Sequence, residues 1–290
     1  MTLIIAKINA TNNFEIYSDT RVTDDVKQEK SKIFEGLVKS IIYSPNININ
    51  FAGTNSAVEE IQKNLNSIDF KLDTKTLIQW LFRFHKSKSM EIEFLIASVE
   101  SKAYGLYKIS QGEIDISKKS SWIGDIDAFE IFQEELHKIK KDKPLDDILD
   151  ISKLAFENVI LNLEAKSVGG VPIIVYRTDN GFQYKEGAIS ILGKDVELNF
   201  QNGAGIILDF GSAPEGSYNY CYLVSANPEN QVIAIHYYDG NVGIFSYPYK
   251  SRKFQLYPNC TAQEFVFLVK VEHDIYLTGI IAERGTMRRV

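Results

Sequence analysis

The pattern of apolar and polar residues at the start of the chain predicts an antiparallel hairpin. Residues 3–8 are mostly apolar, as in a strand, residues 10–13 are typical of a turn, and residues 14–18 alternate between the two faces of a strand. A period of two is typical of a strand with one buried face. Because such a hairpin closes at its turn, its open end brings residue 2 beside residue 19.

Strand-like and helix-like segments follow in alternating groups up to about residue 190. Helical spacing of apolar residues starts at residues 56–59, which fit a capping box, and recurs at 73–85, 129–139 and 146–163, the last apolar on two sides. The polar stretch 24–30 is expected to be a loop over the site. Strands are expected at 32–44, 47–53, 91–99, 103–109, 113–116, 171–176 and 182–185.

The last hundred residues have a different character. Helical periodicity disappears after about residue 195, tyrosines become frequent, and Gly, Pro and Asn turns recur. Strands are expected at 232–237, 242–247, 265–271 and 275–281. The pattern therefore predicts two regions, a layered domain at 1–192 and a β-rich domain or extension at 193–290.

Composition narrows the class of protein. Apolar residues at 44% and charged residues at 24% are ordinary for a globular chain, and the net charge of −6 gives no basic surface for nucleic acid. No run approaches the roughly 18 apolar residues of a membrane span, and no secretory signal is recognisable, so we expect a cytoplasmic protein. The two cysteines and four histidines have no metal-ligand spacing, and no cofactor is expected.

Candidate chemistry lies at the open end of the hairpin. If Met1 is removed, Thr2 carries a hydroxyl and a free α-amine whose pKa is roughly 7.7–8.0, so one residue supplies nucleophile and base. Asp19 and Lys32 are candidates to tune the hydroxyl, and the backbone N–H of Gly53 is a candidate to bind the oxyanion. Each has a plainer reading: Asp19 caps a turn, Lys32 is an exposed strand-start lysine, and Gly53 permits a tight turn.

Four features follow one another in the chain: an N-terminal Thr, a hairpin ending in Ser-Asp-Thr-Arg-Val-Thr (18–23), Lys-Ile-Phe (32–34), and Phe-Ala-Gly-Thr (51–54) before a helix. This order resembles the proteasome β-subunit type of threonine peptidase, an N-terminal-nucleophile hydrolase, over roughly residues 2–190. The resemblance implies an α+β fold, a four-layer αββα sandwich, with the β-rich C-terminal region as an extension. It assigns the nucleophile to Thr2, its tuning to Asp19 and Lys32, and part of the oxyanion hole to Gly53. It further implies a peptide or unfolded-protein substrate and a homo-oligomer that hides the site, and it leaves room for an unfoldase partner.

The chain departs from this family around the expected α-amine. The family has Ser after an Ile-Gly pair, whereas Gly124 is followed by Asp125, whose carboxylate can accept a hydrogen bond from the amine or raise its pKa. Before the Gly-Gly turn, Ala165 and Val168 replace a family Asp and Ser, and Glu164 or Ser167 can substitute. We expect Asp125 and Ser167 to support the amine. The hairpin is also one residue longer than is usual in the family.

Two alternatives to a peptidase stay open. The chain can be a catalytically inactive subunit of the same fold, with a structural or partner-binding role and an interface in its tyrosine-rich C-terminal region. It can also be an amidase of the same superfamily that acts on a small amide. Retention of Met1 favours the inactive subunit, and only substrate screening separates the amidase from the peptidase.

Overall fold

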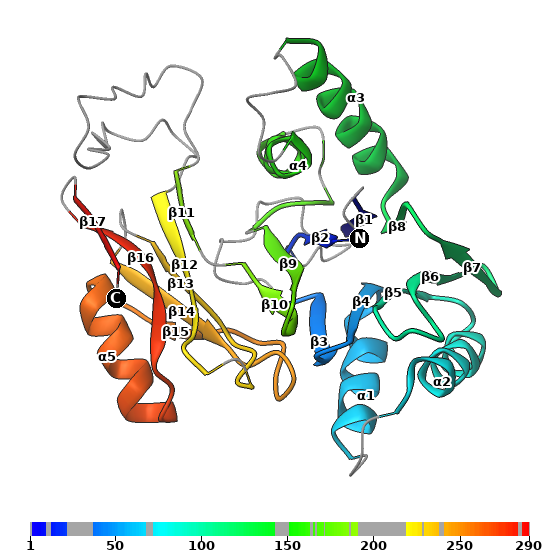
Figure 1. Cartoon of the computed structure of the whole chain (residues 1–290), viewed down its shortest axis with the longest axis horizontal. Coiled ribbons are helices and arrows are strands. Elements are labelled where there is room, and N and C mark those ends of the chain that lie inside the picture. The colour runs from blue at the N-terminus through cyan, green and yellow to red at the C-terminus, as the bar shows by residue number, and fades with distance from the viewer. Residues whose placement is uncertain are drawn as a thin grey trace. The chain divides into compact units, whose positions relative to one another are not determined.

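The computed structural model describes most of the chain and divides it into two compact units. The residues it describes are 2–9, 13–21, 37–67, 72–142, 151–162, 165, 167–170, 172–185, 187–190, 219–227, 229–237, 241–283 and 286–289. Unit 1 comprises Met1–Gln183 and Pro248–Lys253, and unit 2 comprises Tyr184–Tyr247 and Phe254–Val290. Within the described residues there are five helices and three antiparallel sheets, so the expected mixture of helices and antiparallel strands is confirmed (Figure 1).

The first sheet of unit 1 contains the N-terminal hairpin, with strand order β10-β9-β2-β1-β8. In chain order the strands are β1 (Leu3–Ile8), β2 (Phe14–Ser18), β8 (Ser120–Gly124), β9 (Ile173–Thr178) and β10 (Gly181–Tyr184). Helices α3 (Ile126–Asp142) and α4 (Ile151–Leu161) cover one face, where Leu3 and Tyr17 are buried in a cluster with Phe132 and Phe156. Because β1 is central, its backbone is paired on both sides.

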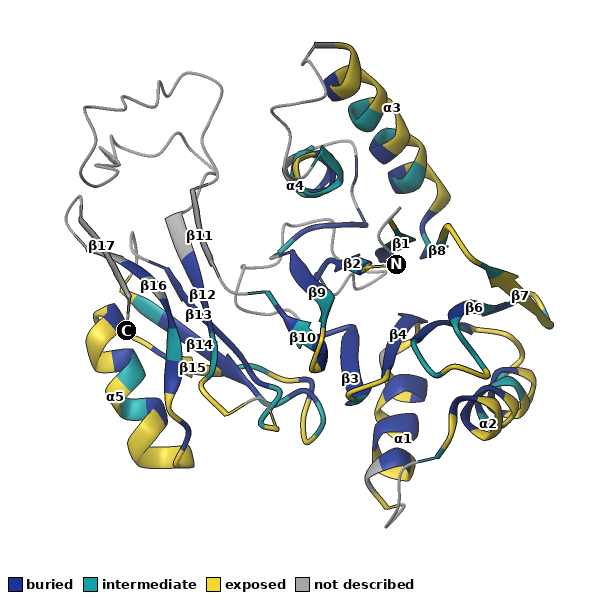
Figure 2. Ribbon diagram, in the orientation of Figure 1, coloured by how far each residue is buried: buried dark blue, intermediate teal, exposed yellow. Residues whose placement is uncertain are grey.

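The second sheet of unit 1 has strand order β3-β4-β5-β6-β7. Its strands are β3 (Ser40–Ser44), β4 (Ile47–Gly53), β5 (Ile92–Ser98), β6 (Gly105–Ser110) and β7 (Glu113–Ser117). Helices α1 (Asn55–Asn66) and α2 (Thr74–Ser87) pack on one face. Residues 47–52 are buried without interruption, so both faces of β4 are covered (Figure 2). Strands β1 and β8 of the first sheet contact strands β4, β5 and β6 of this one.

Unit 2 is built on a third sheet, in the order β15-β14-β13-β12-β16-β17, with β11 also paired to β12. Its strands are β11 (Gly187–Ser190), β12 (Asn219–Ser225), β13 (Ile233–Tyr237), β14 (Val242–Ser246), β15 (Gln255–Tyr257), β16 (Leu277–Glu283) and β17 (Thr286–Arg289). Helix α5 (Ala262–His273) packs on this sheet. The ring of Phe265 fits against Gly243, where a Cβ would collide with it.

The strand expected at residues 265–271 is wrong, because this stretch lies inside α5. Thr261 and Glu264 form a capping box that starts the helix. Phe265 and Val269 are buried four residues apart, which is helical spacing, whereas Phe267 is 63% exposed. Within α5 helical periodicity was therefore present, but apolar residues on the exposed face masked it.

The capping box expected at residues 56–59 is also wrong. Helix α1 begins at Asn55, and its N-cap, Thr54, forms no side-chain cap hydrogen bond. By contrast, Asp73 caps α2 by accepting a hydrogen bond from the backbone N–H of Thr76 at 2.8 Å. Segments 32–36 and 146–150, expected as parts of a strand and a helix, lie outside the described residues, as does the loop expected at 24–30.

Across the described part of the chain, none of the helices is both long enough and apolar enough to cross a membrane.

Candidate active site

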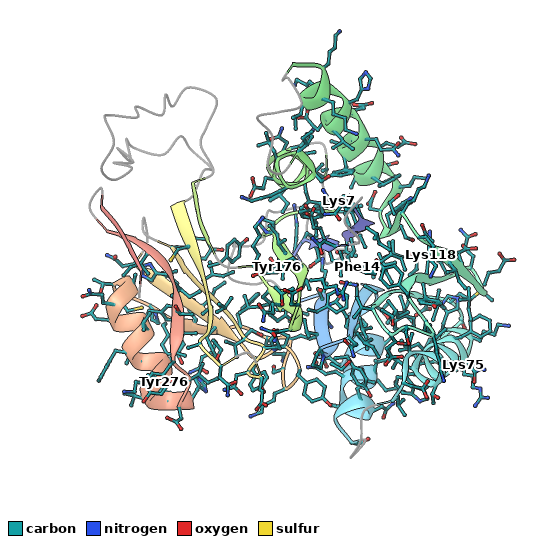
Figure 3. All side chains as sticks on the ribbon, in the orientation of Figure 1. Lys7, Phe14, Lys75, Lys118, Tyr176 and Tyr276 are labelled. Atoms are coloured by element: carbon teal, nitrogen blue, oxygen red, sulfur yellow. The ribbon has the colours of Figure 1, made fainter. Side chains whose placement is uncertain are left out.

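The hairpin brings Thr2 and Asp19 into direct contact. The register of β1 and β2 pairs Ile4 with Ser18, so the residues just beyond the two strand ends meet. The hydroxyl of Thr2 donates a hydrogen bond to Oδ1 of Asp19, and the backbone N–H of Leu3 donates to the same oxygen at 3.1 Å. Thr2 is 2% exposed and Asp19 is fully buried. The opposite end of the hairpin, near Lys7 and Phe14, is labelled in Figure 3.

The lysine at this carboxylate is Lys39. Its Nζ lies 2.9 Å from each carboxylate oxygen of Asp19 and donates to the backbone carbonyl of Arg21 at 2.6 Å. The N–H of Arg21 completes the arrangement by donating to Oδ2 of Asp19 at 3.1 Å. Lys32, expected in this role, lies outside the described residues. The missed signal was a lysine directly before β3, between Val38 and the apolar pair Ile41–Ile42, in a stretch that is buried throughout.

Burial lowers the pKa of the Lys39 amine below its ordinary value of 10.5. The negative charge of Asp19 and its hydrogen bonds oppose this shift, whereas the positive charges of Arg252 and Arg21 add to it. The net direction is downward because desolvation of a cation outweighs the single ion pair. A lysine of this kind exchanges its proton closer to neutral pH than an exposed one, which is a common property of groups in active sites.

The backbone of Gly124 lies directly against Thr2. The residue has a φ of +104°, and a Cβ on it would collide with the carbonyl oxygen of Thr2. That same carbonyl accepts a hydrogen bond from the N–H of Asp125 at 2.7 Å. The carboxylate of Asp125 accepts from the N–H of Ala128 at 3.1 Å and so caps the first turn of α3. Asp125 therefore meets Thr2 through its backbone, while its carboxylate is bound to the helix.

Gly53 lies at the same end of the two sheets but is not bonded to Thr2. Its neighbour Ala52 pairs with Glu93, whose carboxylate accepts a hydrogen bond from the N–H of Gly124 at 2.9 Å. Gly53 has a φ of +132°, and a Cβ there would collide with the backbone of the adjacent strand β5. Among the described residues no hydrogen bond links Gly53 to Thr2. The backbone geometry at this position therefore requires a glycine.

The segment after α4 reaches the site through its glycine turn. The carbonyl of Gly169 accepts hydrogen bonds from the N–H groups of Thr20, at 3.3 Å, and Arg21, at 3.1 Å. Ser167 is buried two residues earlier, and no hydrogen bond between it and Thr2 is found in the described part. Val168, where the resembled family has a serine, is 1% exposed and belongs to the apolar core.

The described residues thus bring together Thr2, Asp19, Lys39 and the backbone of Asp125. This arrangement provides a hydroxyl held by a carboxylate that also binds a buried amine, which is chemistry suited to activating a nucleophile. No cluster of three or more His, Cys, Asp or Glu side chains suited to a metal ion occurs in the described ranges. Neither the models of known protein families nor the curated proteins include a match to this chain.

Proposed function

We propose that the protein is a proteasome-like N-terminal threonine hydrolase that cuts peptide bonds through an acyl-ester on Thr2, after removal of Met1. The observation that carries this proposal is the buried contact of the Thr2 hydroxyl with Asp19, whose carboxylate also binds the Lys39 amine. A carboxylate–lysine pair is costly to bury. The contact of Thr2 with such a pair is therefore unusual for a threonine that has only a structural role.

The proposed reaction uses the amine and hydroxyl of one residue. The α-amine of Thr2 accepts the hydroxyl proton, and Oγ1 attacks the substrate carbonyl to form a tetrahedral oxyanion. The amine then gives this proton to the leaving amine as the C–N bond breaks, which leaves an ester on Oγ1. Water, deprotonated by the same amine, attacks the ester, releases the acid and restores Thr2.

Lys39 and Asp19 have separate roles in this proposal. The Lys39 cation, bound to the same Asp19 oxygen as the Thr2 hydroxyl, favours the developing alkoxide, and Asp19 fixes the position of both groups. Asp125 holds the Thr2 backbone, while Gly53 is proposed to donate to the oxyanion and Ser167 to support the amine. The assignments of Gly53 and Ser167 rest on the family resemblance.

The same proposal includes the layering of unit 1. Its two sheets each carry a pair of helices on one face, and strands of one sheet contact strands of the other. These observations support a four-layer αββα sandwich, in which both sheets are buried on both faces. We also propose a peptide or unfolded-protein substrate, a homo-oligomer and a cytoplasmic location for this enzyme.

A second candidate, an inactive subunit of the same fold, is favoured by one observation. Ala165 and Val168, where the resembled family has polar residues, are 4% and 1% exposed and belong to the apolar core beside the site. Such a subunit would keep Asp19 and Lys39 for folding alone.

Labelling of the first residue separates the two candidates. Intact-mass measurement of the natively expressed protein should show loss of Met1, and an electrophilic peptide probe should add its mass to the N-terminal peptide. Thr2→Ala should abolish both labelling and peptide cleavage while Met1 is still removed, and Thr2→Ser, which keeps a hydroxyl, should retain part of the labelling. Retained Met1, or cleavage by Thr2→Ala at the wild-type rate, refutes the enzyme.

A further inference from the structure

A short segment from the C-terminal half of the chain is built into unit 1 beside the candidate site. This segment, Pro248–Lys253, follows β14 in sequence but belongs to unit 1. The Gln62 side chain donates to the Pro248 carbonyl at 2.7 Å, and Lys253 forms a β-bridge with Leu37. The segment therefore runs along the stretch that leads into β3.

Arg252 binds both backbone groups of Val38, the residue before Lys39. The N–H of Val38 donates to the Arg252 carbonyl at 3.1 Å, and Nε of Arg252 donates to the Val38 carbonyl at 2.6 Å. The guanidinium carbon lies 5.9 Å from the ring centre of Phe51, within reach of a cation–π contact. Arg252 thus fixes both the N–H and the carbonyl of Val38, the residue directly before Lys39.

The burial of the Arg252 cation is costly in free energy. The residue is 4% exposed, and Nη1 is buried without a hydrogen-bond partner. Burial lowers the pKa of Arg252 to about 10, so the side chain is still a cation at neutral pH. A buried cation with an unsatisfied N–H destabilises the fold, and a residue retained at that cost is a candidate for a role in the site.

The charge of Arg252 also acts on Lys39. The groups that set the pKa of the Lys39 amine, besides burial, are Asp19, which raises it, and Arg252 and Arg21, which lower it. The charge on Arg252 is itself favoured by Glu59 of α1. Removal of the Arg252 cation should therefore raise the pKa of Lys39.

We infer that Arg252 is a positioning residue of the candidate site, which holds the backbone of Val38 so that the Lys39 amine reaches Asp19. This inference rests on the proposed function, because it assigns Arg252 a role in activating Thr2. It makes part of the C-terminal half of the chain a component of the site.

Two variants separate the hydrogen bond of Arg252 from its charge. Arg252→Gln places an amide nitrogen where Nε lies, so it can keep the bond to Val38 while it loses the charge. Arg252→Met loses both the bond and the charge. Lys253→Gln, a change of an exposed neighbour in the same segment, is the matched control. The measurement is the rate at which folded full-length protein is labelled on Thr2 by the electrophilic peptide probe, as a function of pH.

The positioning role predicts different results for the two variants. Arg252→Met should slow labelling about tenfold or more, since small displacements of a catalytic group are costly. Arg252→Gln should keep most of the rate, but its alkaline limb should move to higher pH because Lys39 stays protonated longer. Lys253→Gln should match the wild type. A structural role alone would lower the folded fraction without changing the labelling rate per folded molecule or the alkaline limb.

A second readout does not depend on turnover. The titration of Lys39, followed by NMR of labelled lysine side chains and assigned with Lys39→Arg, should move to higher pH in Arg252→Gln. If this shift occurs but no protein is labelled on Thr2, the proposed function fails and the placement of Arg252 stands. If the wild type is labelled and neither variant changes rate, pH profile or Lys39 titration, Arg252 has no positioning role. Should Arg252→Met not fold, Arg252→Lys replaces it: this variant keeps a charge but has a methylene group where Nε lies, so the positioning role predicts about tenfold slower labelling and an unchanged rate overturns it.

Discussion

The sharpest test of the buried site is the substitution Asp19→Asn, which preserves shape but removes a charge. Oδ1 of Asp19 accepts hydrogen bonds from the Thr2 hydroxyl, the Leu3 N–H and the Lys39 amine, and Oδ2 accepts from the Arg21 N–H and the Lys39 amine. All these groups donate to the carboxylate, and of them the Thr2 hydroxyl can also accept. An asparagine amide must therefore point its own NH₂ group at two donors, whichever way it is turned: Leu3 N–H and the Lys39 amine on one side, or Arg21 N–H and the Lys39 amine on the other.

The expected loss of stability follows from these contacts. A hydrogen bond to a charged group contributes about 1.5–3 kcal/mol, and at least two are lost in either orientation of the amide. Removing one partner of a buried ion pair costs about 3–5 kcal/mol, because the other charge stays buried. We expect Asp19→Asn to lower the free energy of unfolding by about 3–5 kcal/mol, a large part of the total of roughly 5–15 kcal/mol for a domain.

Tryptophan fluorescence during urea unfolding reports on this change selectively. Both tryptophans of the chain, Trp80 and Trp122, lie in unit 1, which also contains Asp19. The matched control is Asp115→Asn, a change of an exposed residue on β7, which should shift stability by less than about 0.5 kcal/mol. If Asp19→Asn is as stable as this control, the carboxylate is not bonded as described and the site has to be abandoned.

Two further predictions concern the backbone of the site and its pH dependence. Gly124→Ala should shift the Thr2 backbone, because a Cβ there collides with the Thr2 carbonyl oxygen; labelling of Thr2 should fall at least about tenfold, and unchanged labelling would contradict this. The pKa of Lys39 is lowered in the folded protein, so between that value and 10.5 the unfolded chain binds the extra proton and the contribution of Lys39 to stability rises with pH. Urea unfolding at several alkaline pH values should show that the free energy of unfolding of the wild type rises relative to that of Lys39→Met as pH rises. A constant or falling difference between these free energies would contradict the lowered pKa of Lys39.

The strand and helix pattern of unit 1 was predictable because each element carries its own periodicity. The hairpin at the N-terminus is the clearest case, since its apolar first strand, its turn residues and its alternating second strand lie within the first eighteen residues. The contact of Thr2 with Asp19 follows from that local register. Helix α5 was missed because its exposed face carries Phe267 and Val271, so that its apolar residues do not form a single stripe. The capping box at Thr261 and Glu264 was the signal for it.

The lysine of the site could not be identified by local reasoning. Several lysines follow Asp19 in sequence, and which of them reaches the carboxylate depends on how the chain returns to form β3. Lys39 also depends on its neighbour Val38, whose partner Arg252 is 214 positions away. No periodicity or motif relates residues at that distance.

The sequence by itself determined where strands and helices form in most of unit 1, and that residue 2 meets residue 19, because hydrogen bonding and side-chain alternation within a hairpin act over a few residues. Tertiary structure alone decided that Lys39 binds Asp19, that the backbone of Gly124 lies against Thr2, and that Arg252 enters unit 1. These outcomes depend on burial and charge, which act between groups brought together only when the whole chain has folded.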